Sequence, residues 1–371
     1  MAVFLLDILN ATGHVKPTLA LAVALRKAGH EVFYTHTSRS IFSSYLEQEG
    51  IGKIQYPDGL RACFPDLVLL DQVLRDRADF YRYLRIPFIY VESALSGLIR
   101  QGVPPLDSGF IPKGTGWSDL ICRLLWLLKS RSKVTTPVGQ LVLAATPLDY
   151  PNPMNPHVKN AGPFLNPIEN WHTSPRQANA LYTYIKKSKE AGKVILYCTL
   201  GTYRGFGNSL QVCRFYRLIR GLCERHPEYE VVLSITHSIQ SLGLLPLPRN
   251  MRIFKWMNQT DLLPYTDLVI SHGGMNTLTE CVWASVPMLV YPLRFDEYGN
   301  AARIVYHGLG DRGNMRCASV TSIHQKVQKI LKNKEAIRKR LTNMRMSFET
   351  KNKDIEKIIQ WLEYESSKNN Q

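Results

Sequence analysis

Short apolar runs alternate with segments of helical period along this chain of 371 residues, and they do so in two series. The first series runs from Val3 to Val91, and the second from Val194 to Tyr291. Strands that alternate with helices form parallel βαβ units, whose crossover helices cover the sheet. The sequence therefore predicts an α/β protein with two doubly wound, Rossmann-like parallel-sheet domains.

The individual elements follow from the same periodicity. The predicted strands cover residues 3–9, 31–35, 67–70, 87–91, 194–199, 231–235, 251–254, 268–271 and 288–291. The clearest helices are Pro17–Ala28, which ends at Gly29, and Gln211–Glu224. In doubly wound sheets ligands bind beyond the C-terminal ends of the strands. We therefore expect a ligand cleft between two domains that face each other.

A stretch rich in Pro and Asn, from Pro151 to Pro167, interrupts the periodicity and indicates an interdomain linker. The predicted organisation is an N-terminal domain of residues 1–150, a linker of residues 151–170 and a C-terminal domain of residues 171–345. Residues 346–371 form a C-terminal helix that we expect to pack back on the N-terminal domain.

Charge and cysteine content limit the classes of protein to which the chain can belong. The net charge of +16 indicates an acidic partner, but the chain has no nucleic-acid motif, and we expect no nucleic-acid partner. Seven cysteines without a CxxC pair predict a reducing compartment and no metal site. The N-terminal apolar run lacks a basic n-region, so we predict a first strand rather than a signal peptide, and a cytoplasmic protein.

The turn His272-Gly273-Gly274 lies between a predicted strand and a predicted helix. Such a turn presents free backbone N–H groups and the positive end of the helix dipole, which suits a diphosphate. Glycines let a phosphate approach the main chain, and His272 can donate a further hydrogen bond. An ordinary capped strand-to-helix turn has the same residue types, so this motif alone leaves both interpretations open.

The segment from Trp256 to Asn300 resembles the donor-binding signature of the family-1 glycosyltransferases. These are inverting UDP-sugar enzymes of the GT-B fold, and they include bacterial macrolide and carotenoid (zeaxanthin) transferases. The positions that match are Trp256, Gln259, His272, Gly274, Asn276, Thr277, Glu280, Pro287, Pro292, Asp296 and Asn300. The resemblance implies a UDP-sugar donor domain at the C-terminus and an acceptor-binding domain at the N-terminus.

The resemblance also implies a role for each matched residue. Trp256 would stack on the uracil, while Gln259 and Glu280 would bind the ribose hydroxyls. The residues that would hold the diphosphate are His272, Gly273, Gly274, Asn276 and Thr277. A carboxylate such as Glu280 suits two vicinal hydroxyls, because its two oxygens match them.

Two further pairs of residues would contact the sugar end of the donor. Gly201 and Thr202 follow a strand and would contact donor phosphate or sugar. Asp296 would bind the sugar hydroxyls, together with Glu297. The family usually has Gln where this chain has Glu297, and a carboxylate cannot donate a hydrogen bond as an amide does. Glucose is the sugar that we expect by default.

The sequence Asn10–Pro17, NATGHVKP, resembles the GHxxP turn in which the family carries its general base. His14 is the candidate base, because an imidazole of pKa near 7 can take the proton of an acceptor hydroxyl. A carboxylate that orients the other ring nitrogen would strengthen such a base. The later sequence PDLVLLD makes Asp71 the candidate for this role. Asp66 stands before the strand and is the weaker choice.

These residues imply direct displacement at the anomeric carbon with inversion, without a metal or other cofactor. The acceptor would be a small, lipophilic molecule with a hydroxyl group. Between the second strand and PDLVLLD the chain has fewer residues than the family normally has, so we expect an abbreviated N-terminal domain. The alternatives are a UDP-sugar epimerase of the same fold and a catalytically impaired UDP-sugar binding protein. A nicotinamide-dependent oxidoreductase is disfavoured, because no GxGxxG follows the first strand.

Two segments raise the question of membrane contact. The basic region from Lys326 to Arg345 is either a solvated helix face or a surface for anionic lipid. The apolar segment from Leu120 to Leu128 is too short to cross a bilayer, and it is either a core or pocket helix or a helix that dips into a membrane. A lipophilic acceptor is compatible with peripheral contact of this kind.

Overall fold

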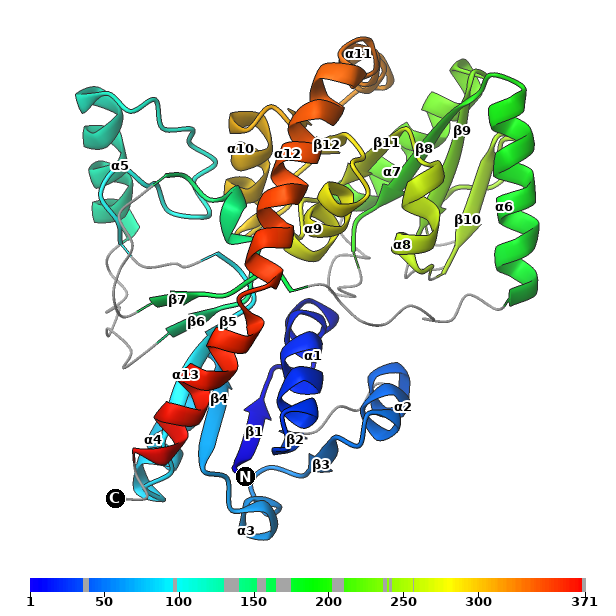
Figure 1. Ribbon diagram of the computed structural model, residues 1–371. Coiled ribbons are helices and arrows are strands. Elements are labelled where there is room, and N and C mark those ends of the chain that lie inside the picture. Colours follow the sequence, from blue (N-terminus) through cyan, green and yellow to red (C-terminus); the bar gives the residue numbers. More distant parts are fainter. Residues whose placement is uncertain are drawn as a thin grey trace. The chain divides into compact units, whose positions relative to one another are not determined.

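The computed structural model describes residues 1–35, 40–95, 99–129, 140–151, 158–164, 175–201, 210–235, 239, 242–255 and 257–368. The chain divides into two compact units, each built on one sheet (Figure 1). The first unit comprises residues 1–100, 127–169 and 347–371. The second unit comprises residues 101–126 and 170–346.

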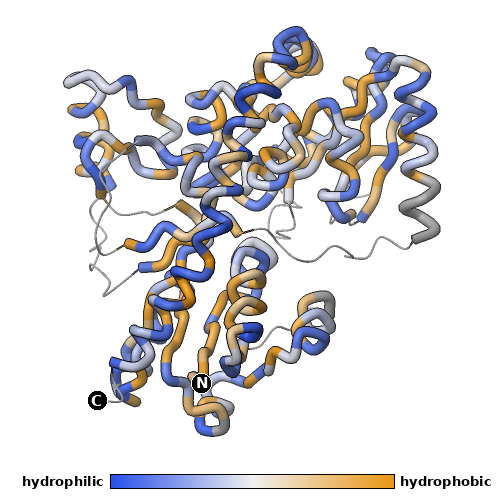
Figure 2. The backbone as a smooth tube through the Cα atoms, viewed as in Figure 1, coloured by the Kyte–Doolittle hydropathy of each residue, from blue (hydrophilic) through white to orange (hydrophobic). Residues whose placement is uncertain are grey.

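The first unit contains a seven-stranded sheet of order β3-β2-β1-β4-β5-β6-β7, in which every pair of neighbours is parallel. Its strands are β1 (Val3–Asp7), β2 (Glu31–Thr35), β3 (Gly52–Ile54), β4 (Leu67–Asp71), β5 (Phe88–Glu92), β6 (Gln140–Val142) and β7 (Val158–Asn160). All five residues of β4 are buried, which explains why this central strand is a continuous apolar run in the sequence. In Figure 2 the central strands β1 and β4 have the colour of hydrophobic residues.

Helices and short turns connect these strands. They are α1 (Thr12–Lys27), α2 (Ser40–Gln48), α3 (Leu60–Cys63), the 3-10 helix Gln72–Arg77, α4 (Ala78–Tyr83), the 3-10 helix Thr146–Leu148 and α13 (Ile355–Ser367). The C-terminal helix α13 belongs to this unit, where Nε2 of His30 lies 2.9 Å from Oε1 of Glu363. The abbreviation of this domain relative to the family stays a prediction.

The second unit contains a six-stranded parallel sheet of order β10-β9-β8-β11-β12-β13. Its strands are β8 (Val194–Thr199), β9 (Tyr229–Ser234), β10 (Met251–Phe254), β11 (Leu268–Ser271), β12 (Met288–Val290) and β13 (Gly310–Arg312). Its helices are α5 (Gly116–Lys129), α6 (Pro175–Glu190), α7 (Leu210–Arg225), α8 (Gln259–Leu262), the 3-10 helix Leu263–Tyr265, α9 (Met275–Trp283), α10 (Glu297–Tyr306), α11 (Val320–Lys332) and α12 (Lys334–Asn352). The boundaries between the two units fall near the ends of α5 and α12.

Residues 101–126 group with the second unit, although the sequence suggested that they belong to the N-terminal domain. Close packing explains this difference. A Cβ on Gly299 would come within 2.1 Å of the Leu106 carbonyl oxygen, so only glycine admits this approach. Arg312 donates from Nη1 to the carbonyl oxygen of Gly109 at 2.5 Å. These contacts join the segment to α10 and β13.

Several element boundaries differ from the sequence-based prediction. Helix α1 begins at Thr12 and contains Pro17, whereas the pattern suggested a start at Pro17 itself. The unpaired carbonyl that a proline leaves one turn earlier falls on Gly13, which is exposed, so water can satisfy it. The strands β3, β6, β7 and β13 were not predicted, because three residues are too few to show a period.

No helix among the described residues combines the length and the apolar character needed to cross a bilayer.

Candidate functional site

Both sheets have a topological switch point, where the strand order reverses. In the first unit it lies between β1 and β4, and in the second it lies between β8 and β11. Connections that diverge from two neighbouring parallel strands leave a crevice beyond their C-terminal ends. His14 and Asp71 follow β1 and end β4, while Gly201 and His272 follow β8 and β11. These residues, which the sequence predicted, thus lie at the switch point of each sheet.

His14 and Asp71 are in direct contact. Nδ1 of His14 lies 2.7 Å from Oδ2 of Asp71. An ionised carboxylate only accepts hydrogen bonds, so the imidazole donates from Nδ1 and keeps the lone pair of Nε2 available. The His14 side chain is 25% exposed and that of Asp71 is 5% exposed. The carboxylate is therefore buried behind a ring that still reaches solvent.

Backbone N–H groups hold the Asp71 carboxylate in place. Oδ2 accepts a hydrogen bond from the Leu9 amide at 3.2 Å, and Oδ1 accepts one from the Val73 amide at 3.0 Å. Asp66 has a different position, because its Oδ2 accepts from the Val3 amide at 2.7 Å, at the start of the sheet. Asp66 thus lies at the opposite end of β4 from His14.

Ser93 is a neighbour of His14 that the sequence-based reasoning missed. Its Oγ lies 3.2 Å from Nδ1 of His14. Ser93 directly follows β5, which pairs with β4, so the rule that places sites at the C-terminal ends of strands includes it. The serine hydroxyl adds a second polar contact on the side of the ring that faces Asp71.

Asp7 was also missed, although it ends β1 and is fully buried. Its carboxylate accepts hydrogen bonds from Thr35 Oγ1 at 2.6 Å, Arg77 Nη1 at 2.6 Å and Tyr81 OH at 2.8 Å. Burial, followed by the nearby Asp7 charge, raises the pKa of the Tyr81 hydroxyl well above its ordinary value. Asp7 is thus a paired structural charge that fixes the end of β1 beside the His14 loop.

In the second unit, the ring of His272 lies between two glycines. A Cβ on Gly201 would come within 2.7 Å of Cε1 of His272, and a Cβ on Gly274 would come within 2.5 Å of Nε2. Gly201 also has a φ of +79°, which side chains rarely adopt. Both glycines are therefore needed for the ring to occupy this position.

His272 is a neutral imidazole at physiological pH. Burial lowers its pKa to about 4, and a backbone contact with Thr199 opposes this shift only in part. Nδ1 is buried and has no hydrogen-bond partner among the described residues. Part of the residue surface nevertheless reaches solvent. This arrangement suits a neutral hydrogen-bond donor to a ligand.

Helix α9 begins directly after the Gly-Gly turn. Its N-cap is Gly274, which supplies no side-chain hydrogen bond to the first-turn N–H groups. The turn is tight, since Gly273 has a φ of +94° and its amide donates to Ser271 Oγ at 3.2 Å. A helix N-terminus of this kind provides N–H donors and a positive dipole end for an anion.

The predicted nucleoside residues lie on α8 and α9. Gln259 is the first residue of α8, and its Oε1 accepts from Thr277 Oγ1 at 3.4 Å. Glu280 lies one turn after Asn276 on α9, and it is 8% exposed. These side chains therefore come from neighbouring elements at the same strand edge. Trp256 and Thr202 fall outside the described residues.

Asn300 connects the Gly-Gly turn with the predicted sugar residue Asp296. Its Nδ2 donates to the Gly273 carbonyl oxygen at 3.0 Å and to Oδ2 of Asp296 at 2.8 Å. Asn300 is buried on α10, and Asp296 is the N-cap of that helix. One buried amide thus fixes the position of Asp296 relative to the turn before α9.

Glu297 is the residue at which this chain departs from the family signature. It is 6% exposed, and its Oε2 accepts from the amides of Leu293 at 2.7 Å and Arg294 at 3.0 Å. Burial raises its pKa to about 7, with a smaller contribution from the Asp296 charge, while the two amides oppose the shift. A large fraction of Glu297 is therefore protonated at neutral pH, and a protonated carboxyl has the donor and acceptor pattern of an amide.

Comparison with known proteins agrees with this geometry. The model of the glycosyltransferase family 28 C-terminal domain matches residues 225–359, which include α8, α9 and α10. The zeaxanthin glucosyltransferase of Pantoea ananas is 25% identical over 70% of this chain. Both comparisons show that the C-terminal part of the chain is similar to glycosyltransferases.

Solved structures of glycosyltransferases show that the chain has the GT-B fold. The glycosyltransferase of kitacinnamycin matches with a TM-score of 0.72 at 20% identity, over 98% of this chain and 99% of that one. A transferase from Siraitia grosvenorii, solved with UDP, matches with a TM-score of 0.68 at 14% identity, over 99% of this chain and 100% of that one. In sequence, the chain spans 63% of the zeaxanthin glucosyltransferase, which is less than two thirds of its length.

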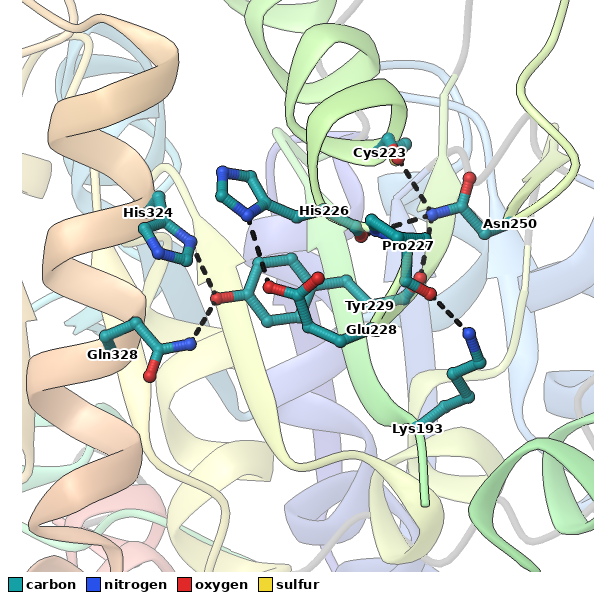
Figure 3. A network of polar contacts seen from close by, with 9 residues as sticks. All are labelled: Lys193, Cys223, His226, Pro227, Glu228, Tyr229, Asn250, His324 and Gln328. Atoms are coloured by element: carbon teal, nitrogen blue, oxygen red, sulfur yellow. Dashed lines mark hydrogen bonds and ion pairs between the residues drawn. The ribbon is translucent and has the colours of Figure 1, made fainter. Parts of the chain in front are cut away.

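The structure also contains a group of possible metal ligands that the sequence-based reasoning did not identify. Among the described residues, ligand atoms of His226, Glu228 and His324 lie within 4.8 Å of one another (Figure 3). Nδ1 of His226 is 3.1 Å from Oε1 of Glu228, and Nδ1 of His324 is 2.9 Å from the Tyr229 hydroxyl. The spacing His-x-Glu before β9 is the sequence signal that points to this group.

This group lies apart from the predicted donor residues, and its two histidine rings are not oriented to bind one ion. His226 and Glu228 precede β9, so they lie at the N-terminal edge of the sheet, whereas His272 follows the C-terminal end of β11. The rings of His226 and His324 are stacked 3.7 Å apart with an interplanar angle of 8°. The nitrogen lone pairs of stacked rings lie in two parallel planes that do not meet, so at least one ring would have to turn for both to bind one ion.

Proposed function

We propose that this protein is an inverting glycosyltransferase that moves a sugar, by default glucose, from a UDP-sugar to a hydroxyl of a small lipophilic acceptor. One observation carries the proposal: the His14–Asp71 pair and the His272 turn occupy the switch points of the two sheets. The similarity to glycosyltransferases agrees with the transfer of a sugar. The names of the relatives support glucose, since one is a zeaxanthin glucosyltransferase.

In this proposal His14 is the general base. Its Nε2 takes the proton of the acceptor hydroxyl, and the resulting imidazolium is stabilised by Asp71 at Nδ1. The acceptor oxygen forms a bond to the anomeric carbon as the bond from that carbon to the UDP oxygen breaks. The electron pair leaves with UDP, and the configuration at the anomeric carbon inverts. Ser93 lies within reach of Nδ1 and helps to position the ring.

The second unit holds the donor in this proposal. Negative charge grows on the diphosphate as UDP departs, and the N-terminus of α9 and neutral His272 would meet it with fixed dipoles. Gln259 and Glu280 would bind the ribose, with Trp256 stacked on the uracil. Asn276 and Thr277 would supply further contacts to the phosphates, and Gly201 and Thr202 would approach the donor from β8.

Asp296 and Glu297 would bind the sugar hydroxyls. The contact from Asn300 leaves Asp296 anchored to the same turn as the proposed diphosphate site. We propose that no metal is required, because the dipoles of α9 and the hydrogen bond from His272 stabilise the departing charge. A cytoplasmic location and peripheral contact with an anionic membrane complete the proposal, and nucleic acid is not an expected partner.

A mass-spectrometric acceptor screen with UDP-glucose tests the proposal directly. Acceptors should include carotenoid, macrolide, flavonoid and sterol alcohols. The expected product is an acceptor heavier by one hexose, together with free UDP. Conversion of UDP-glucose into an isomeric UDP-sugar would identify an epimerase instead. UDP-sugar binding without any product would identify an impaired binding protein.

A further inference from the structure

Helix α5, labelled in Figure 1, is rich in apolar residues. Six of its large apolar side chains are exposed. The exposed fractions are 78% for Trp117, 46% for Leu120, 39% for Ile121, 50% for Leu124, 69% for Leu127 and 82% for Leu128. A helix on the surface of a soluble domain normally shows polar residues to solvent and buries its apolar ones. Contiguous exposed apolar surface on a protein marks an interaction site.

These six residues lie on one face of the helix. At about 100° per residue, they cover an arc of about 120° with no polar residue within it. We call this arc the α5 apolar face. The other side of the helix contains Ser118, Cys122 and Trp126, which are buried. The amphipathic pattern of α5 is thus directed outward rather than toward the core.

Specific contacts hold α5 in this orientation. Trp126 donates from Nε1 to the Val103 carbonyl oxygen at 2.8 Å, and Ser118 Oγ accepts from the Lys113 amide at 2.9 Å. A rotation that buried the α5 apolar face would break both hydrogen bonds and expose Trp126. The apolar face therefore belongs to the folded structure and is not a consequence of loose packing.

Positive charge borders the α5 apolar face. Arg123 lies beside one edge of this face in the helical projection, and Lys129 is the last residue of the helix; both are exposed, as is Lys113 before the helix. Asp119 is the single acidic residue of α5, and the net charge of the chain is +16. Apolar side chains flanked by cations match the boundary between lipid headgroups and acyl chains, when the headgroups are anionic.

We propose that α5 docks on the surface of an anionic lipid bilayer, with Trp117 and the leucines of the α5 apolar face inserted at the headgroup boundary. Its 14 residues give a length of about 21 Å, which is too short to span the hydrocarbon core, so the helix lies in the surface plane. A second copy of the chain is a poorer occupant. Symmetric pairing of two such faces would bring two sets of exposed cations, Arg123, Lys113 and Lys129, close to each other.

This inference does not depend on the proposed transferase activity. It identifies the membrane contact surface as α5 rather than as the basic region from Lys326 to Arg345. Substitutions can distinguish these two candidate contact surfaces, because the basic region offers charge without an apolar face of this size. Docking would also bring the protein to acceptors that are dissolved in lipid.

Vesicle sedimentation tests the proposal with the full chain. We expect the protein to pellet with vesicles of phosphatidylglycerol and phosphatidylcholine, and to pellet less with phosphatidylcholine alone or at high salt. The double variant Leu124→Ser/Leu128→Ser should bind the anionic vesicles at least about tenfold more weakly, because it loses two inserted side chains. The matched control Leu210→Ser/Leu245→Ser removes two leucines that are 84% and 53% exposed elsewhere, and should bind like the parent.

A second pair of variants tests the charge component. Arg123→Glu/Lys129→Glu should also weaken binding to anionic vesicles, and added salt should affect it less than the parent. Size-exclusion chromatography with light scattering gives the oligomeric state. No pelleting of the parent, or equal pelleting of the parent and Leu124→Ser/Leu128→Ser, overturns the proposal. A parent dimer that this variant dissociates, without vesicle binding, assigns the α5 apolar face to a second copy instead.

Discussion

Nδ1 of His14 lies 2.7 Å from Oδ2 of Asp71, across 57 residues of sequence. Parallel pairing of β1 with β4 produces this contact, because it brings the C-terminal ends of the two strands together. The carboxylate is itself fixed by the amides of Leu9 and Val73. The fixed carboxylate in turn holds the His14 ring in one orientation, with Nε2 directed away from Asp71.

We expect His14→Ala to lower transfer to an alcohol acceptor by about 10²- to 10⁴-fold, the usual contribution of a positioned general base. UDP affinity should stay near that of the parent, because the proposed partner of His14 is the acceptor proton. A phenol acceptor, whose hydroxyl ionises more readily, should recover part of the loss. Initial rates and UDP titrations provide the two measurements. Transfer to an alcohol at the parental rate would make His14 a structural residue of α1.

Asp71→Asn should lower the rate of sugar transfer, by an amount that is harder to predict than for His14→Ala, because an amide can hold the ring in the wrong tautomer. Asp66→Asn is its matched control, since Asp66 contacts the Val3 amide at the other end of β4. The control should leave the turnover rate per folded molecule unchanged. Equal losses of turnover in both variants would contradict a specific role for Asp71.

The location of these residues could be predicted from sequence for a physical reason. A continuous apolar strand such as β4 leaves a clear signal, and the parallel arrangement fixes which of its ends carries polar side chains. The same reasoning preferred Asp71 over Asp66. The Gly-Gly turn before α9 alone left an anion site and an ordinary capped turn both open, and only the wider resemblance from Trp256 to Asn300 favoured the anion site.

Other features could not be predicted, because they depend on contacts between distant segments. The attachment of residues 101–126 to the second unit requires the close approach of Leu106 to Gly299. The triad of partners around Asp7 comes from β2, a 3-10 helix and α4, which no local pattern connects. The stacked pair His226 and His324 is likewise separated in sequence. Single-sequence periodicity carries no information about such pairs.

UDP should raise the melting temperature without added metal, because any ligand of the native state stabilises it by mass action. Zn²⁺ is the informative control, since His226 and His324 offer it possible ligands at the other edge of the sheet. Any Zn²⁺ effect on the melting temperature should disappear in His324→Ala, while the UDP effect should remain. A UDP effect that needs a metal even in His324→Ala would contradict the metal-independent donor site.

Trp256→Ala and Glu280→Ala should weaken UDP binding, because both residues are assigned to the nucleoside. Asp296→Ala should leave UDP affinity unchanged and impair sugar transfer. Asn300 contacts both Asp296 and the Gly273 carbonyl oxygen, so the melting temperature of this variant must be measured as well. Isothermal titration with UDP and with UDP-glucose separates the two classes. Equal loss of UDP affinity in all three variants would contradict the division into nucleoside and sugar contacts.

Gly201→Ala should weaken UDP binding and destabilise the protein, because the new Cβ would displace the His272 ring from a distance of 2.7 Å. Gly192→Ala is the matched control. Gly192 also has a positive φ, of +74°, but no atom lies within 4 Å of its added Cβ. Both variants pay backbone strain of about 1 kcal/mol or more, so only the displacement of His272 distinguishes them. Unfolding in urea and UDP titration should show the larger effect at Gly201.

Glu297→Gln should remove a pH dependence that the parent shows near neutrality. Burial raises the pKa of Glu297 to about 7 in the folded protein, against an ordinary value of 4.5. The folded state therefore binds this proton more tightly than the unfolded state. The stabilisation is fully present below pH 4.5, and it is lost as the pH rises through about 7, by about 1.4 kcal/mol per unit within that window. The contribution of His272 to the free energy of unfolding changes with pH in the opposite direction, because burial lowers its pKa to about 4. That contribution is lost as the pH falls below 6.5.

The comparison between parent and Glu297→Gln isolates the glutamate, since the His272 contribution is common to both. The difference in their free energies of unfolding should change steadily between pH 4.5 and 7 and become constant above it. Protonated Glu297 can donate a hydrogen bond to a sugar hydroxyl, as an amide can, so the ratio of UDP-glucose to UDP affinity should rise in the parent from pH 8 to pH 6. That ratio should not change with pH in Glu297→Gln. A ratio that is independent of pH in the parent would show that Glu297 does not contact the sugar as a protonated acid.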